Sequence, residues 1–598
     1  MSYQSELGER DSAIGYLFAR FIAEQAGQPE RGTVARTAAW LADIQMQGDV
    51  CLDLAVHAAT PWPNQKDLTP DLERWCRELR ETCCVGKPGE LAPLTLDGSK
   101  LYLNRFWRYE NGVASSIITR LNQPQTINRL LLQQGLQRLF GEQKSDTIDW
   151  QMLAAALATT RQFSVISGGP GTGKTASLVK VLVLLLEQQP KMVIRMAAPT
   201  GKAAARMVES IRAAKADVKT DETIRARIPD QALTLHRLLG FSPRGYRHDK
   251  HNPLILDCLV IDEASMVDLP MMARLLEALP DTARLMMLGD RDQLASVDAG
   301  NVLGDITGHG HEIAYSLETA RELADLTGSD LSLLPIEAGA PKVANAIALL
   351  RKSYRFKAES GIGRLAYSIN SGNAKAAVEL LSQAAGGELE WLPETPLNAL
   401  LDQIIGAYTP YLQTQSVGEA MQLFEKQRVL CAVRQGPVGV VTINQMIASR
   451  LQRRGLLGGG DAVQGVPVMV TGNNYELGLF NGDVGLLWRN AEGNLRAYFR
   501  QSDNELRDIP AQTLPQHELS WAMTVHKSQG SEFERVILLL PEVQEGGAVL
   551  TRELLYTAVT RAKKQFTLYG KSEAVNRAVM HTVQRSTGLA SRLQWPSV

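Results

Sequence analysis

The stretch Phe163-Ser-Val-Ile-Ser-Gly-Gly-Pro-Gly-Thr-Gly-Lys-Thr175 joins a short apolar strand to a glycine-rich turn and the start of a helix. Gly168 is followed by four residues and then by Gly173, Lys174 and Thr175, which is the spacing of a phosphate-binding loop. Glycines let backbone N–H groups curl around phosphate oxygens without Cβ clashes, and the helix N-terminus adds a positive dipole end. The sequence therefore predicts a nucleoside triphosphate site, with Lys174 at the β- and γ-phosphates and the Thr175 hydroxyl on Mg²⁺. The loop residues expected to hold the nucleotide are Gly168, Gly169, Pro170, Gly171, Thr172, Gly173, Lys174 and Thr175.

Length and composition limit the number of domains and the class of protein to which the chain can belong. A chain of 598 residues is long enough for about four domains. No apolar run approaches the ~20 residues of a membrane span, and the first residues lack the apolar segment of a signal peptide, so we expect a cytoplasmic protein with no membrane partner. Six cysteines do not suggest a disulfide framework. The net charge of −1 gives no global sign of nucleic-acid binding, which leaves open a basic groove.

Apolar strands alternate with helical segments in two parts of the chain. Such alternation indicates parallel sheets covered by helices on both faces, hence an α/β fold with two sheet domains. We place the first domain at 111–335 and the second at 336–463 plus 514–598. The expected strands are Phe163–Ile166, Val193–Ala198, Leu256–Ile261 and Arg284–Leu288 in the first domain, and Arg428–Val433, Val536–Leu540 and Phe566–Tyr569 in the second.

Three further segments carry no catalytic motif. Residues 1–110 are expected to form a mainly helical domain, which either packs on the sheet domains or docks a partner. Its first helix shows apolar residues at helical spacing: Ile14, Leu17, Phe18, Phe21 and Ile22. The polar and basic residues 240–254 predict a protruding hairpin or loop. Short strands separated by turn signals within 464–513 predict a small β-barrel.

Paired carboxylates, Asp262 and Glu263, end the predicted strand Leu256–Ile261. Following a phosphate loop, Asp262 is expected to hold Mg²⁺ and Glu263 to polarise the water that attacks the γ-phosphate. The next strand runs into Gly289-Asp-Arg-Asp-Gln293, at the sheet edge where ligands bind. We expect Gln293 to sense the γ-phosphate.

Two arginines of the second domain are candidates for contact with the transferred phosphoryl group. Arg355 lies in Lys352-Ser-Tyr-Arg-Phe356, and Arg561 lies in Tyr556-Thr-Ala-Val-Thr-Arg561. An arginine from a facing domain stabilises the charge on the equatorial oxygens and couples closure of the cleft to the nucleotide.

Hydroxyl, imidazole and ammonium groups follow other strands and suit the phosphates of a nucleic-acid strand. The segments are Pro199–Arg206, Thr234–Leu239 and Trp521–Glu532. The side chains expected to contact DNA are Thr200, Lys202, His236, Thr524 and His526.

In this order the segments resemble the motifs of superfamily 1 helicases. Over roughly residues 105–598 the sequence is similar to the RecD family of that superfamily's 1B group. The similarity is carried by the segments Ile166–Thr175, Ala197–Arg206, Leu288–Val297, Gly478–Asp483 and Trp521–Phe533. The resemblance implies two RecA-like motor domains and an SH3-like barrel at 464–513. It also implies that Gln151 reads adenine, that Gly530 and Glu532 contact the nucleotide, and that ATP and Mg²⁺ are used.

The resemblance further implies a 5′-to-3′ translocase on single-stranded DNA, working with RecB-like and RecC-like subunits to unwind and resect duplex DNA ends for recombinational repair. The nuclease centre is then expected in the RecB-like subunit. The alternatives are a helicase that works alone, a DNA-end-binding switch ATPase, and a silent scaffold subunit. The last is disfavoured because every expected ATPase residue is present.

Overall fold

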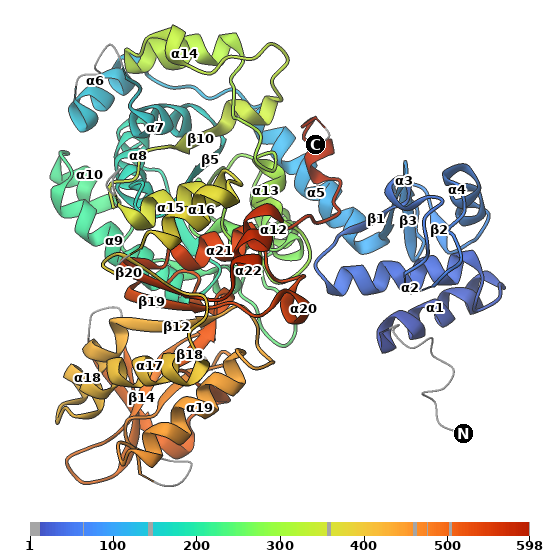
Figure 1. Cartoon of the computed structure of the whole chain (residues 1–598). Helices are drawn as coiled ribbons and strands as arrows, with labels where there is room; N and C mark the ends of the chain where they lie inside the picture. Colours follow the sequence, from blue (N-terminus) through green and yellow to red (C-terminus); the bar gives the residue numbers. More distant parts are fainter. Residues whose placement is uncertain are drawn as a thin grey trace.

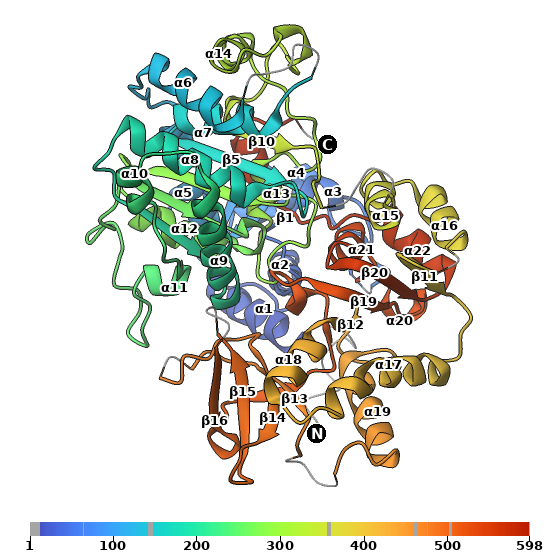
Figure 2. The same cartoon turned by 90° about the vertical axis from the view of Figure 1, so that its left-hand side faces the viewer.

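The structure is a computed structural model that describes residues 12–63, 65–141, 147–355, 360–384, 386–458, 463–474, 476–501 and 505–596. An N-terminal domain lies to one side of two sheet domains, and an antiparallel insertion extends from the second sheet domain (Figures 1 and 2). The buried apolar side chains of the protein therefore form several separate clusters, and the largest of them surrounds the first sheet.

The first sheet has six parallel strands in the order β10-β5-β9-β8-β6-β7. Its four predicted strands are confirmed within one or two residues. The strand β10 was not predicted; it pairs with β5 and lies beyond residue 335, where we expected the domain to end. Four apolar residues give too short a pattern to identify a strand without its partner. The strands are β5 Phe163–Gly168, β6 Ile194–Ala198, β7 Leu233–Thr234, β8 Cys258–Ile261, β9 Arg284–Gly289 and β10 Ile347–Leu350.

Helices cover the first sheet, and α8, which follows the phosphate loop, is buried along most of its length. The helices are α5 Asn104–Leu121, α6 Arg129–Phe140, α7 Trp150–Thr160, α8 Lys174–Gln188, α9 Gly201–Asp217, α10 Glu222–Arg227, α11 Leu235–Leu238, α12 Leu269–Ala278, α13 Val302–Ile306 and α14 Leu317–Thr327. The segment 240–254 is a loop with isolated bridges between Ser242 and Gly245 and between Asp249 and Asn252.

The second sheet has five parallel strands in the order β11-β20-β19-β12-β18. The three predicted strands are confirmed, so the chain contains two parallel-sheet domains as expected. The strands are β11 Leu389–Leu392, β12 Gln427–Cys431, β18 Ala522–Thr524, β19 Phe533–Leu539 and β20 Ala562–Tyr569. The helices are α15 Gly361–Asn370, α16 Ala374–Ser382, α17 Leu397–Leu412, α18 Val417–Glu425, α19 Val440–Arg453, α20 Val543–Gly546, α21 Arg552–Val559, α22 Ser572–Met580 and α23 Leu589–Arg592.

The insertion in the second domain is an antiparallel sheet in the order β16-β15-β14-β13-β17. The strands are β13 Pro467–Val470, β14 Val484–Arg489, β15 Leu495–Arg500, β16 Leu506–Pro510 and β17 His517–Leu519. The predicted strands form, but the expected SH3-like barrel is not confirmed: within the described part of the insertion, β16 and β17 stand at the two ends of the strand order and are not paired with each other. Closure of a barrel depends on pairing between the first and last strands, which turn signals do not encode.

The N-terminal domain combines helices with a small sheet of order β1-β4-β3-β2. The predicted first helix forms as α1, but its side chains are not all buried. Ile22 is buried, whereas Ile14 and Leu17 are 56% and 61% exposed. The elements are α1 Ala13–Ala26, α2 Thr33–Met46, α3 Leu54–His57, α4 Leu72–Arg80, β1 Cys51–Asp53, β2 Val85–Gly86, β3 Leu94–Asp97 and β4 Lys100–Leu103. Within the described ranges, no helix is long and apolar enough to cross a membrane.

The helix α5 joins the N-terminal domain to the first sheet domain through a buried arginine. The Arg120 guanidinium donates to the carbonyl oxygens of Ala283 (3.3 Å), Leu279 (3.2 Å) and Pro280 (2.7 Å). These carbonyls lie in the connection between α12 and β9. The Arg120 side chain therefore ties this connection, at the start of β9, to α5.

Replacing Arg120 by methionine should destabilise the first sheet domain. The substitution keeps the apolar stem but removes three charge-assisted hydrogen bonds and leaves the Leu279 carbonyl without its Arg120 donor, so the free energy of unfolding should fall by about 3 kcal/mol. Chemical denaturation followed by circular dichroism measures the change. Arg108→Met, an exposed position on the same helix, is the control and should stay within about 0.5 kcal/mol. Equal effects of the two substitutions would contradict the role of Arg120.

Candidate functional site

The phosphate loop connects β5 to α8, as the sequence predicts. Gly171 and Gly173 have φ of 77° and 82°, in the left-handed region that favours glycine. A Cβ on Gly173 would lie 2.3 Å from Gln151 Nε2, and one on Gly171 would lie 2.2 Å from the Cβ of Arg355. These two glycines are therefore required both by the backbone and by what packs against the loop.

The Lys174 ammonium lies within the loop, where it donates to the carbonyl oxygens of Gly168 (2.6 Å) and Gly169 (3.3 Å). The Thr172 hydroxyl donates to the Gly169 carbonyl (2.8 Å), which holds the turn closed. The Lys174 ammonium thus lies beside the N-terminus of α8, where the helix dipole also favours an anion.

Asp262 and Glu263 lie at the carboxyl end of β8. Glu263 has φ of 52°, and its N–H donates to Asp262 Oδ1 at 2.9 Å. Burial and the neighbouring Glu263 raise the pKa of Asp262 to about 6, while Lys174 opposes this shift. A buried carboxylate with so little positive charge beside it fits a divalent cation, and Thr175 and Asp262 offer the hard oxygen ligands that Mg²⁺ prefers. Among the described residues no group of three or more His, Cys, Asp or Glu could hold a metal by itself, so a nucleotide would have to complete the ligand set.

The second sheet domain contacts this site through α21. The Tyr556 hydroxyl donates to Asp290 Oδ2 (3.2 Å), which also accepts from Gln293 Nε2 (2.9 Å). The Leu294 N–H donates to the Thr557 hydroxyl (2.9 Å). The segment after β9, which holds the predicted sensor Gln293, therefore lies at the junction of the two domains.

The two candidate arginines differ in their surroundings. Arg355 lies beside the phosphate loop, because the neighbouring Tyr354 N–H donates to the Gly171 carbonyl at 2.7 Å. The Arg355 guanidinium forms an ion pair with Glu532 (2.6 Å). Arg561 is buried and donates from Nε to the Thr557 carbonyl (3.1 Å) and from Nη1 to the Ser531 carbonyl (3.2 Å). Its guanidinium is thus turned toward carbonyls of its own domain.

Three basic side chains lie near the Glu532 carboxylate. Burial by itself would raise the pKa of Glu532, but Arg355, Lys563 and Arg206 outweigh burial, so the pKa is lowered. Lys563 Nζ lies 3.4 Å from Glu532 Oε2. Gly530, two residues earlier, has φ of 64°, and a Cβ there would lie 4.0 Å from Glu263 Oε1. Of the predicted nucleotide contacts, Gly530 thus lies near Glu263 of the first domain, and Glu532 lies near Arg206 of the first domain.

A cavity of about 1340 Å³ opens between the two domains at the phosphate loop. Gly168, Gly169, Tyr354 and Tyr556 are among its lining residues. A second cavity of about 320 Å³ is lined by Trp150, Gln151 and Tyr354, and shares Tyr354 and Thr172 with the first. Gln151 Nε2 donates to the Thr172 carbonyl (2.9 Å). The arrangement offers one space for phosphates and an adjoining aromatic space for a base.

The predicted strand-binding residues lie at the carboxyl ends of strands in both sheets. Thr200 follows β6, and its hydroxyl accepts from the Ala203 N–H (3.2 Å) as the N-cap of α9. His236 follows β7, the neighbour of β6, and packs against the rings of Phe241 and Tyr246. Thr524 ends β18 and accepts from the Lys527 N–H (3.3 Å), while His526 follows it. Burial lowers the pKa of both histidines, so they are neutral at pH 7.

Comparison with known proteins gives the family. The chain is 36% identical to "RecBCD enzyme subunit RecD" of Haemophilus influenzae, over 84% of this chain and 82% of that protein. It is also 36% identical to the subunit of the same name from Mycobacterium tuberculosis, over 92% and 89%. The chain belongs to the RecD family.

Three family descriptions fall on separate parts of this RecD family member. The N-terminal domain of RecBCD enzyme subunit RecD matches residues 12–102, an AAA domain matches 151–299, and a UvrD-like helicase C-terminal domain matches 519–569. The crystal structure of Bacteroides Pif1 bound to single-stranded DNA aligns with a TM-score of 0.37 and 18% identity, over 71% of this chain and 92% of that one.

Sequence reasoning assigned no role to two residues of the insertion, Phe480 and Asp483, that lie beside the predicted strand-binding segment of this RecD family member. A Cβ on Gly201 would lie 2.7 Å from the Phe480 ring, and Asp483 faces Lys202 closely enough to affect its pKa. The only signal was the segment Gly478–Asp483, which carries part of the family resemblance but lies more than 270 residues from Lys202 in the chain.

Lys202 should make binding of single-stranded DNA depend on pH. Burial, followed by the nearby Arg206 and Arg428, lowers the pKa of Lys202 to about 7, while Asp483 and Glu425 oppose this shift. A phosphate favours the ammonium, so binding above pH 7 must take up a proton, and the affinity for oligo(dT) should fall from pH 7 to pH 8 by up to about tenfold.

Fluorescence anisotropy of labelled oligo(dT) between pH 6 and 8 measures this dependence. Lys202→Arg is the matched control, because arginine keeps its charge over the whole range, so its affinity should vary less with pH. An equally steep decline in both proteins would show that Lys202 is not the titrating contact.

Proposed function

We propose that this chain hydrolyses ATP between its two parallel sheets and uses the resulting movement to travel 5′ to 3′ along single-stranded DNA. As a member of the RecD family it is an ATP-dependent DNA helicase. The observation that carries the proposal is the packing of the second domain on the phosphate loop: a Cβ on Gly169 would lie 2.7 Å from the Tyr556 hydroxyl, which donates to Asp290. Tyr354, in the segment that joins the two sheets, donates to the Gly171 carbonyl. A nucleotide in this loop must therefore change how the two domains meet.

The first domain supplies the hydrolytic groups in this proposal. Lys174 binds the β- and γ-phosphates, and Glu263 orients the attacking water. Thr175 and Asp262 would hold Mg²⁺, which would supply positive charge against the phosphates. Gln151 contacts the adenine in the smaller cavity, against the ring of Tyr354.

The segment that joins the two sheets supplies Arg355, and the second domain supplies Arg561. Arg355 is paired with Glu532 and lies beside the phosphate loop, so its approach to the γ-phosphate exchanges one anion for another. Arg561 would reach the phosphate by leaving its carbonyl partners as the cleft closes. Gln293, which shares Asp290 with Tyr556, would report the presence of the γ-phosphate to the second domain.

The DNA strand is proposed to cross the carboxyl ends of β6 and β7 in one domain and of β18 in the other. Thr200, Lys202 and His236 would hold phosphates on the first domain, and Thr524 and His526 on the second. Opening and closing of the cleft would then alternate the grip of the two domains and advance the protein along the strand.

We further propose that the chain works with RecB-like and RecC-like subunits at duplex DNA ends in recombinational repair, with the nuclease centre in the RecB-like subunit. The curated relatives are named as RecBCD enzyme subunits. The exposed Ile14, Leu17 and Phe21 of α1 give the N-terminal domain an apolar face of the kind that partner subunits cover. The six cysteines are free, in keeping with a reducing cytoplasm.

Translocation tests the proposal directly. Steady-state ATP turnover is measured on single strands of increasing length, with the purified chain alone and with its partner subunits. Turnover that rises with strand length supports stepping, and earlier displacement of a label at the 3′ end than at the 5′ end supports the direction. Turnover independent of length would favour a DNA-end-binding switch ATPase instead. Lys174→Gln is the control, since it should bind DNA and lack hydrolysis.

Arg561→Gln should retain nucleotide binding and lose hydrolysis. An arginine that stabilises the transferred phosphoryl group contributes about 10³-fold or more to turnover and little to ground-state binding. Binding of a fluorescent ATP analogue and steady-state hydrolysis are compared, with Lys564→Gln, an exposed position on β20, as the control. Loss of both binding and hydrolysis would point to a structural role for the buried side chain. Unchanged hydrolysis would remove Arg561 from the mechanism.

A further inference from the structure

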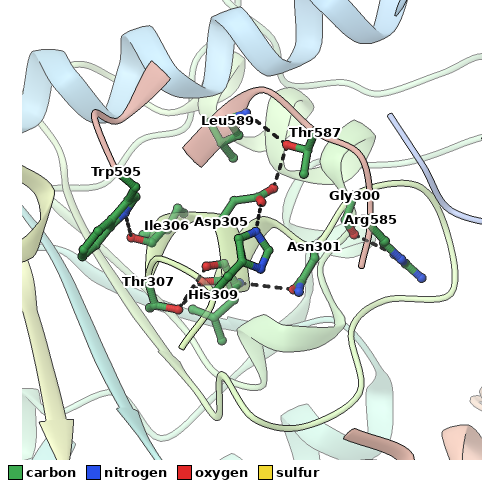
Figure 3. Close-up of polar contacts among 12 residues, drawn as sticks. Gly300, Asn301, Asp305, Ile306, Thr307, His309, Arg585, Thr587, Leu589 and Trp595 are labelled. Atoms are coloured by element: carbon green, nitrogen blue, oxygen red, sulfur yellow. Dashed lines mark hydrogen bonds and ion pairs between the residues drawn. The ribbon is translucent and has the colours of Figure 1, made fainter. Parts of the chain in front are cut away.

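After α22 the chain leaves the second sheet domain and returns to the first. The Val583 N–H still bonds Glu553 of α21 (3.0 Å), and from Arg585 onward every contact described below is to other domains. We call residues 585–596 the strap. Figure 3 shows the strap passing beside α13 and the loop that precedes it.

The strap is anchored on both the N-terminal domain and the first sheet domain. The Ser586 carbonyl accepts from the Val50 N–H (2.9 Å), and the Thr587 carbonyl accepts from Lys100 Nζ (2.6 Å). At its far end, Trp595 Nε1 donates to the Ile306 carbonyl of α13 (3.0 Å; Figure 3). Arg585 therefore lies between the Val583 contact with α21 and the anchors at Ser586 and Thr587.

Arg585 binds the backbone of a single loop, Ser296–Gly300. Its Nη1 donates to the carbonyl oxygens of Asp298 (2.8 Å) and Gly300 (2.8 Å), and its Nη2 donates to that of Ser296 (2.7 Å). Three charge-assisted hydrogen bonds from one planar group fix the shape of this loop strongly. The N-terminal domain adds a fourth contact, from the Gly300 N–H to the Gly48 carbonyl (2.9 Å).

The start of the same loop region belongs to the nucleotide site. The Arg291 N–H donates to the Ser167 hydroxyl of β5 (3.2 Å). Asp290 accepts from the Tyr556 hydroxyl of α21, and the Leu294 N–H donates to the Thr557 hydroxyl of the same helix. Gln529 Nε2 also donates to the Leu294 carbonyl (2.7 Å). The segment 290–300 is therefore fixed at its first half by the nucleotide cleft and at its second half by the strap.

The second half of this segment also faces the proposed strand site. Val297 is 73% exposed at its tip. Asp298 lies close enough to Asp268 to raise its pKa, and Asp268 in turn faces His236. On the other side, the Arg585 charge adds to burial in lowering the pKa of His526. The geometric link to the second half of the strand path is Gln529, three residues after His526, which donates to the Leu294 carbonyl just before the loop (2.7 Å).

We propose that Arg585 is a positioning residue that holds Ser296–Gly300 in the shape needed to transmit the nucleotide state to the DNA strand. The inference rests on the proposed function for the meaning of the strand path. Arg585 touches neither the nucleotide cleft nor any reacting atom, so its contribution is to coupling rather than to chemistry. Because it enters from the strap, the coupling loop depends on a segment that follows the second sheet domain and is anchored on the N-terminal domain.

The test compares Arg585→Ala with Lys100→Met in the full chain. Both substitutions remove strap contacts, but only the first removes contacts to the loop. For Arg585→Ala we expect ATP turnover without DNA to stay within about twofold of the parent, and stimulation by oligo(dT) to fall about tenfold. Lys100→Met should keep its stimulation. Arg585→Lys, which retains the charge with fewer hydrogen bonds, should lie between the parent and Arg585→Ala.

Hydrogen exchange of the backbone amides in 296–301 gives a second reading that needs no DNA. Exchange should rise in Arg585→Ala and stay at the parent's rate in Lys100→Met. If Arg585→Ala does not fold, Arg585→Lys is measured in its place, and a rise in exchange together with reduced stimulation is still expected.

The outcomes separate the two proposals. Equal losses of stimulation in Arg585→Ala and Lys100→Met would overturn the positioning role and indicate general docking of the strap. Unchanged exchange in 296–301 would overturn it as well. A parent chain whose turnover is not stimulated by DNA would instead contradict the proposed function, and the exchange measurement would still decide whether Arg585 holds the loop.

Discussion

The close packing of the phosphate loop against the segment after β10 and against Tyr556 of the second domain is the constraint on which the rest of the structure depends. A Cβ on Gly169 would lie 2.7 Å from the Tyr556 hydroxyl. The Tyr354 N–H bonds the Gly171 carbonyl at 2.7 Å, and no side chain larger than hydrogen fits beside the Cβ of Arg355. The phosphate loop is therefore a site for phosphate and also the point at which the two sheets meet. Any ligand that occupies the loop changes the junction, which is the physical basis for coupling chemistry to movement.

The charges at the junction are arranged around shared anions. Glu532 is paired with Arg355 and Lys563, and Asp290 accepts from both Gln293 and Tyr556. Each anion is buried or half-buried and holds groups of more than one segment. A triphosphate brings further negative charge to the same groups, so it competes with these carboxylates for the same donors.

The strap and the N-terminal domain connect this junction to parts of the chain that lack catalytic motifs. Arg585 and Gly48 both bond Gly300 of the loop after β9, and a Cβ on Gly48 would lie 2.7 Å from Cζ of Arg585. The N-terminal domain, whose α1 leaves apolar side chains exposed, is thus in direct contact with the loop that follows Gln293, the proposed nucleotide sensor. A partner bound on that domain would act on the same loop.

The sequence by itself determined the two parallel-sheet domains and the phosphate loop, because both are local. Apolar strands of four to seven residues, glycines at fixed spacing and carboxylates after a strand are read within short windows. From the order of motifs it also predicted site roles for Arg355, Glu532 and Gln293, which stay predictions. The tertiary structure decided what is not local: that β10 joins the first sheet, that the predicted barrel strands form a sheet order with unpaired ends, and that α1 exposes part of its apolar stripe. It also decided that Arg585 contacts Ser296–Gly300. Pairings between residues hundreds of positions apart follow from packing, and no window of sequence contains both partners.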